Sequence, residues 1–169
     1  MAQLRITEEE SQLLLTYIKD TKLPGGLDRA KFLMAVSVLY REFSPQNSLG
    51  PVAREIAETV VEQILQDCDN QVLEGALYLL WTLSHTSGIA QAISQIPHLG
   101  AALKQMQQTS ISLISSLAKS VLWQLGYGNY EGTIFVHDYS IAFMNNCMPA
   151  CEKISITLHL SSKYYQVAK

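Results

Sequence analysis

The sequence predicts an all-α fold: a short helical solenoid of two to three repeats, followed by a small C-terminal helix–strand tail. Apolar residues recur at helical spacing from about residue 7 to residue 125. Within that stretch Leu80-Trp81 returns as Leu122-Trp123, 42 residues later. Beyond it, apolar and polar residues alternate, as is typical of a strand. The expected division is therefore 1–126 for the solenoid and 127–169 for the tail.

The first two helices are marked by a start signal and a break. Thr7 and Glu10 have the spacing of a capping box, in which each side chain binds the other residue's backbone amide. The helix that follows should end at the turn Leu23-Pro24-Gly25-Gly26, because proline and paired glycines stop helices. A second helix, from about Asp28 to Phe43, is apolar on most of its faces, which predicts a central position.

The remaining helices follow from periodicity. A third, amphipathic helix has an apolar residue at every fourth position, at Val52, Ile56, Val60, Ile64 and Cys68. Asp69-Asn70 is expected to start a fourth helix. Short helical segments are predicted around Ile89–Ile96 and Leu99–Met106, and a long one from about Ser110 to Leu125.

The repeat extends beyond the Leu-Trp pair. Ala76 returns as Ala118 with the same offset of 42, and Ala35-x-x-x-Leu39-Tyr40 is a weaker copy 41 residues before Ala76-x-x-x-Leu80-Trp81. A period of about 40–47 residues in an all-helical chain indicates an armadillo or HEAT solenoid. One helical hairpin cannot bury its own apolar face, but stacked copies can.

The segment from about Thr7 to Leu125 resembles the armadillo repeat specifically. The third helix of that family often reads Ala-x-x-x-Leu-Trp-Ala-Leu-Ser-Asn, and this chain has Ala76-Leu-Tyr-Leu-Leu80-Trp81-Thr-Leu83-Ser84-His85. In armadillo proteins that hold extended peptides, the third helices line a groove in which the Trp forms pockets and the Asn grips the peptide backbone. The resemblance places the Trp positions at Tyr40, Trp81 and Trp123, and the Asn positions at Ser44, His85 and Tyr127.

These six residues are the candidate partner-binding groove, and two interpretations of them stay open. The Asn positions carry other residues, so the resemblance does not imply peptide capture of the importin type. The tryptophans fit either the packing between repeats or a groove that contacts a partner. His85 fits a histidine that interacts with the end of its own helix better than it fits a ligand.

The tail resembles the middle of a Toll/interleukin-1 receptor (TIR) domain. The similar run is Phe135-Val-His-Asp-Tyr-Ser140-Ile-Ala-Phe-Met-Asn-Asn-Cys-Met-Pro-Ala-Cys151-Glu-Lys153-Ile-Ser-Ile-Thr-Leu-His-Leu160-Ser-Ser-Lys-Tyr164. The family's opening strand and first helix have no counterpart here. The helix that carries the catalytic Glu of NAD-cleaving members has no counterpart here either. TIR domains are known in combination with armadillo repeats from SARM-like proteins. The resemblance therefore implies a TIR-like segment without NAD hydrolysis.

Composition argues against several classes of partner. Charged residues make up 16% of the chain, against roughly 25% in an average domain. The 12 basic residues form no cluster that would suit nucleic acid or an anionic membrane surface. No apolar stretch reaches the ~20 residues of a membrane span. Three cysteines are too few and odd in number for a disulfide framework, which favours a reducing, cytoplasmic location.

The chemistry-bearing residues do not favour an enzyme. Cys147 and Cys151, with His137 and His159, could be imagined as zinc ligands, but their spacing suits small core cysteines better. We therefore expect no catalytic residue, no bound metal and no cofactor. The expected function is a non-enzymatic scaffold or adaptor that binds a protein, with self-association through the C-terminal end as a further expectation. The alternative is a fragment of an armadillo–TIR signalling protein whose solenoid is regulatory.

Overall fold

The computed structural model describes residues 6–20, 23, 28–43, 50–66 and 69–126. They form seven α-helices and no strand, which confirms the all-α prediction for this part of the chain: α1 (Glu8–Lys19), α2 (Arg29–Phe43), α3 (Pro51–Leu65), α4 (Asn70–Leu83), α5 (Ser87–Ser94), α6 (Leu99–Gln107) and α7 (Ser112–Gln124). The predicted tail, 127–169, with its expected helix and strand, lies outside the described residues.

Local signals fix several helix ends. Thr7 Oγ1 accepts the amide of Glu10 at 3.1 Å and Glu10 Oε1 accepts the amide of Thr7 at 3.2 Å, so the predicted capping box is confirmed. Asp69 caps α4 by accepting the amide of Val72 at 2.9 Å. Gly126 follows α7 with φ +89°, a left-handed conformation that glycine adopts without strain.

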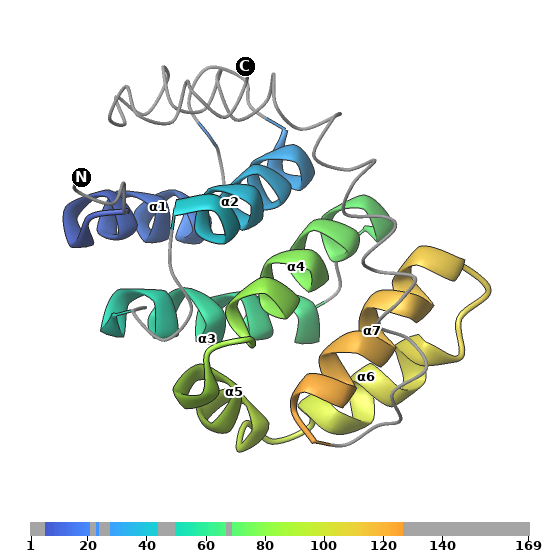
Figure 1. Cartoon of the computed structure of the whole chain (residues 1–169). Coiled ribbons are helices and arrows are strands. Elements are labelled where there is room, and N and C mark those ends of the chain that lie inside the picture. The colour runs from blue at the N-terminus through green and yellow to red at the C-terminus, as the bar shows by residue number, and fades with distance from the viewer. Residues whose placement is uncertain (1–5, 21–22, 24–27, 44–49, 67–68, 127–169) are drawn as a thin grey trace.

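The helices lie in two layers (Figure 1). In one layer α2 packs against α4, and α4 packs against α7. In the other layer α3 contacts α1, α5 and α6. The layers are joined by the pairs α3–α4 and α6–α7, which are also neighbours along the chain. The central helix α4 therefore has neighbours on several sides.

The contact between α2 and α4 is the most extensive in the described structure. A Cβ added at Gly75 would lie 2.8 Å from the carbonyl oxygen of Ala30, so the two backbones approach closely there. Further along, the Ser37 hydroxyl lies 2.7 Å from Thr82 Oγ1 and 3.4 Å from the Tyr78 carbonyl oxygen. The early residues of α2 thus face the early residues of α4, and the later ones face the later ones, so the two helices run parallel.

Positions related by the sequence repeat lie in the core. Among the described residues, the alanines and leucines of the three copies are each 0–1% exposed: Ala35, Ala76, Ala118, Leu39, Leu80 and Leu122. Because alanine has a small side chain, it lets neighbouring helices approach. The offset that the sequence displays therefore coincides with equivalent buried positions on α2, α4 and α7.

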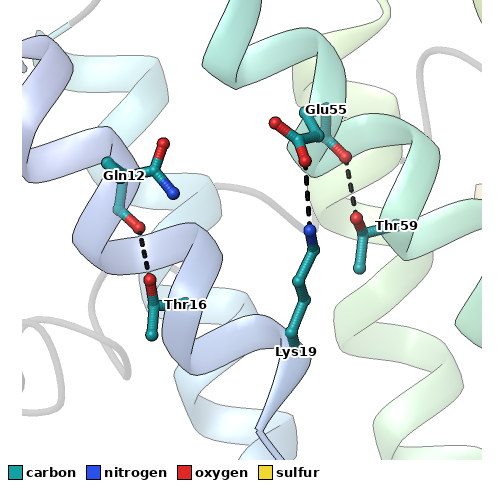
Figure 2. Close-up of polar contacts among 5 residues, drawn as sticks. All are labelled: Gln12, Thr16, Lys19, Glu55 and Thr59. Carbon is teal, nitrogen blue, oxygen red and sulfur yellow. Dashed lines mark hydrogen bonds and ion pairs between the residues drawn. The ribbon is translucent and has the colours of Figure 1, made fainter.

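Polar contacts join α1 to α3 at the surface of the other layer (Figure 2). Lys19 Nζ of α1 lies 3.0 Å from Glu55 Oε1 of α3, and both side chains are about half exposed. The hydroxyls of Thr16 and Thr59 instead donate to carbonyl oxygens of their own helices, those of Gln12 and Glu55, at 2.9 Å each. An exposed pair such as Lys19–Glu55 contributes about 0–1 kcal/mol, so burial of apolar residues dominates this contact.

Candidate functional site

The structure describes four of the six candidate groove residues: Tyr40, Trp81, His85 and Trp123. Ser44 and Tyr127 lie outside the described residues. Tyr40 is on α2, Trp81 on α4 and Trp123 on α7, while His85 follows the last residue of α4 by two positions. All four therefore belong to the layer α2–α4–α7 or to the chain directly after one of its helices.

Tyr40 is a core residue in this structure. Its side chain is 3% exposed, and its hydroxyl donates a hydrogen bond to Ser11 Oγ of α1 at 2.9 Å. Burial raises the pKa of the Tyr40 phenol well above its ordinary value, and the charge of Glu8 adds to that shift, while the bond to Ser11 opposes it. Tyr40 thus joins α2 to α1 and offers little surface to a partner.

Trp81 is also largely covered, at 9% exposed. Its ring meets the ring of Tyr78 edge to face, with centroids 5.9 Å apart and an interplanar angle of 84°. The indole Nε1 is buried without a hydrogen-bond partner among the described residues. A buried indole N–H usually finds an acceptor, so this atom marks a polar position that the described residues leave unsatisfied.

His85 extends the aromatic contacts to the end of α4. Its ring lies edge to face against Trp81 at a centroid distance of 4.7 Å. Its Nδ1 lies 2.8 Å from the Trp81 carbonyl oxygen and donates to it in the tautomer that carries the proton on Nδ1. The residue is only partly buried. It interacts with one of the last carbonyl groups of its own helix, as expected for a histidine at this position, and keeps part of its ring at the surface.

Trp123 differs from Trp81 although both occupy the same place in the repeat. Trp123 is only partly buried. The two residues differ in burial because their helices have different neighbours. Trp81 lies on α4, which packs against both α2 and α7, whereas Trp123 lies on α7, which contacts α4 and α6 among the described helices. Of the four described candidates, His85 and Trp123 therefore offer the accessible surface.

Glu74 belongs to the same face of α4 and was not among the residues expected from the sequence. Glu74, Tyr78, Trp81 and His85 are spaced by four, three and four residues, which places them along one side of the helix. We call these four residues the α4 stripe. A signal was present in the sequence, because Glu74 is the only acidic residue between Asn70 and Gly126.

The Glu74 carboxylate has an unusual environment. The side chain is partly buried, and burial raises the pKa of its carboxyl group above the ordinary value. The ion pairs of the described residues are Lys19–Glu55 and Arg54–Glu58, so no described cation lies within ion-pair distance of Glu74. The α4 stripe therefore combines a buried aromatic centre with a carboxylate that forms no ion pair with a described residue.

The structure does not test the four residues that were considered as zinc ligands and judged to fit core positions better, because His137, Cys147, Cys151 and His159 lie outside the described residues. Within the described ranges, no three His, Cys, Asp or Glu side chains lie close enough together to hold a metal ion. None of the seven described helices is long and apolar enough to cross a bilayer.

Comparison with known proteins gives no relative from which a role could be transferred. No protein-family model, no curated protein and no solved structure matches this chain. The armadillo and TIR resemblances therefore stay predictions, and function has to be argued from the geometry of the layer α2–α4–α7.

Proposed function

We propose that this chain is a non-enzymatic protein-interaction module, a short armadillo-like solenoid that binds a protein partner across the layer α2–α4–α7. The observation that carries the proposal is the coincidence between the repeat in the sequence and the packing of the helices. Equivalent small and branched residues are buried on three helices that contact one another in succession. Stacked repeats of this kind create extended surfaces that such proteins use for binding.

The partner surface we propose consists of the partly buried residues of that layer. His85 and Trp123 present aromatic rings, and Glu74 presents a carboxylate. Aromatic residues are enriched at the centres of protein interfaces because they bury a large area for few rotatable bonds. Tyr40 and Trp81 support this surface from beneath, since both are buried and join neighbouring helices or rings.

The proposal is tested with a surface variant and a matched control. His85→Ala combined with Trp123→Ala removes two partly exposed rings, whereas Gln95→Ala combined with Lys104→Ala alters exposed residues directly after α5 and in α6. A partner identified by co-purification from the native cell is purified, and its Kd is measured for the wild type and for both variants. We expect the surface variant to bind about 10-fold or more weakly, as loss of interface anchors does, and the control to bind as the wild type does.

Stability has to be followed in the same experiment, because the loss of either ring can also weaken folding. Thermal unfolding of each variant is measured beside its affinity. If the surface variant loses affinity only in proportion to a lowered melting temperature, or if the control loses as much, the layer α2–α4–α7 is not the binding surface.

A further inference from the structure

We propose that the chain's own C-terminal tail, residues 127–169, docks against α2 on the side that carries Lys31, Ala35 and Val38. These residues are spaced by four and three positions, so they lie along one side of the helix, which we call the outer side of α2. The inference goes beyond the proposed function, because it concerns a contact within the chain and leaves the rings of His85 and Trp123 to an outside partner.

Two other sides of α2 are occupied by described helices. Ser37 contacts α4 through its hydroxyl, and Tyr40 donates a hydrogen bond to α1. Successive residues of an α-helix point about 100° apart, so each residue of the outer side points about 100° or more away from both Ser37 and Tyr40. In Figure 1, α2 lies at one edge of the described helices, with α1 and α4 as its neighbours. The outer side therefore faces neither of these neighbours.

The outer side of α2 is nevertheless covered over most of its length. Lys31 is exposed, whereas Ala35 and Val38, about one and two turns further on, are 0% and 2% exposed. All six residues of the run 35–40 are at most 3% exposed, and six successive residues point to every side of a helix. A helix at the edge of a layer would otherwise leave one side to solvent. The cover must therefore come from residues outside the described ranges.

The tail has the length and the composition to supply that cover. Each other segment outside the described ranges holds six residues or fewer, and it either precedes α1 or connects two helices. The tail is the longest such segment and continues from Gly126 at the end of α7. Its apolar residues alternate with polar ones at Ile154, Ile156, Leu158 and Leu160. Docking would remove these side chains and the apolar outer side of α2 from water together, which is the main favourable term in such a contact.

Cross-linking of the full wild-type chain tests where the tail lies. A lysine-reactive cross-linker is applied to an equimolar mixture of isotope-labelled and unlabelled chain, and the linked peptides are identified by mass spectrometry. We expect Lys153 and Lys163 of the tail to be linked to Lys31, the exposed residue of the outer side, far more often than to Lys104, which is exposed on α6. Linked peptides should carry the same isotope, because the contact lies within one chain.

A buried thiol tests the contact with α2 itself. In a full chain whose native cysteines are replaced by serine, Val38→Cys places a thiol on the outer side, and Val60→Cys places one on α3 where the wild-type residue is 0% exposed. We expect Ile156→Asp combined with Leu158→Asp to make the thiol of Val38→Cys react with a maleimide at least about 10-fold faster, because its local cover is lost. The thiol of Val60→Cys should stay protected.

A matched control separates lost apolar contact from added charge. Ser155→Asp combined with Thr157→Asp adds the same charge at neighbouring polar positions, and it should leave the thiol of Val38→Cys protected. The proposal is overturned if the tail lysines are linked to Lys104 as often as to Lys31, or if that thiol reacts equally in all three chains. Equal acceleration at both probe positions would also overturn it, because the tail would then support the whole fold. Links only between chains of different isotope would identify a second copy as the occupant and would overturn it as well.

Discussion

Gly75 shows how a single missing Cβ can set the distance between two helices. A Cβ at this position would lie 2.8 Å from the Ala30 carbonyl oxygen and 3.2 Å from Leu33 Cβ. The first neighbour is backbone, which cannot rotate away as a flexible side chain can. The contact between α2 and α4 can therefore be this close only because residue 75 is glycine.

We expect Gly75→Ala to lower the free energy of unfolding by about 1–3 kcal/mol, because α2 and α4 must separate to admit the methyl group. Gly100→Ala is the matched control: it lies in α6, and a Cβ there meets nothing within 4 Å. That change should leave stability unchanged or raise it by up to about 1 kcal/mol, since alanine favours helix over glycine. Urea unfolding of both variants decides the point, and equal effects would contradict the close approach.

The two tryptophans should differ in the same kind of measurement. Trp81 is 9% exposed and contacts Tyr78 and His85, so Trp81→Ala should cost about 3–5 kcal/mol by leaving a cavity. Trp123 is only partly buried, so Trp123→Ala should cost clearly less. Chemical unfolding monitored by circular dichroism avoids any dependence on tryptophan emission. A larger loss of unfolding free energy for Trp123→Ala than for Trp81→Ala would contradict the deeper burial of Trp81.

Tyr40 predicts a loss of stability at alkaline pH. Its phenol has a raised pKa in the folded chain because burial disfavours the phenolate. A group of this kind contributes stability that is complete below its unfolded pKa of about 10 and is lost as the pH rises above that value. Tyr40→Phe should cost about 1 kcal/mol at neutral pH, through the lost bond to Ser11, and should flatten the decline above pH 10. Unfolding measured from pH 7 to 11 tests this, and equal slopes for the two proteins would contradict it.

At the scale of the element, helix ends divide into those held by side chains and those that are not. Asp69 caps α4 through a bond to the amide of Val72, whereas Thr86 at the start of α5 makes no side-chain cap bond. We expect Asp69→Ala to cost about 1 kcal/mol and Thr86→Ala to cost clearly less. Thermal unfolding of the pair measures the difference. Equal losses of stability in the two variants would mean that the bond from Asp69 to the Val72 amide does not stabilise the protein.

The same division explains part of the agreement between predicted and observed helix starts, although α6 begins at the predicted Leu99 without a side-chain cap bond. The starts of α1 and α4 follow from Thr7, whose predicted cap bond is confirmed, and from Asp69, whose side chain caps the helix that was expected to start there. The helix expected around Ile89–Ile96 instead runs from Ser87 to Ser94, and α7 begins at Ser112 rather than near Ser110. Both helices lack a side-chain cap bond at their start. Where local chemistry does not mark a boundary, packing decides it, and packing is not visible in a single sequence.

The candidate site was predicted in part for a related reason. The repeat identified Tyr40, Trp81 and Trp123 as equivalent positions, but it could not show that the first two are buried while Trp123 is more accessible. Exposure at an equivalent position depends on how many helices flank it. Glu74 was missed because the significance of a single carboxylate depends on the absence of cations nearby in space, which the sequence order does not reveal.

At the scale of the whole molecule, charge is distributed unevenly along the sequence. Acidic residues are frequent up to Glu74, and none occurs from Gly75 to Tyr130. The surface of α5–α7 is accordingly provided mostly by neutral polar residues such as Gln91, Gln95 and Gln105. The low overall charge of 16% therefore comes largely from the later helices. Because interface centres are depleted in charged residues, a partner bound over α7, which belongs to the proposed binding layer, meets little desolvation cost from charged groups.

The arrangement of neighbours predicts how stability is distributed. The helices α4 and α3 each contact several others, whereas α7 contacts α4 and α6 among the described elements. If the helices form the proposed stack of repeats, stability is a sum of terms within each unit and terms between neighbouring units, so opening at one end need not open the other. Native-state hydrogen exchange should therefore show the slowest amides in α4 and faster exchange in α6 and α7.

A core substitution at the C-terminal end separates this behaviour from all-or-none unfolding. Leu117 of α7 is 0% exposed, so Leu117→Ala should destabilise its surroundings by about 2–5 kcal/mol. If the described helices form a stack of nearest-neighbour units, amide exchange should accelerate in α6 and α7 far more than in α1 and α2. A matched Leu15→Ala variant, in which a buried leucine of α1 is shortened, should show the opposite gradient. Equal acceleration in all helices for both variants would mean that the chain unfolds as one cooperative unit, and would remove the main physical support for a solenoid.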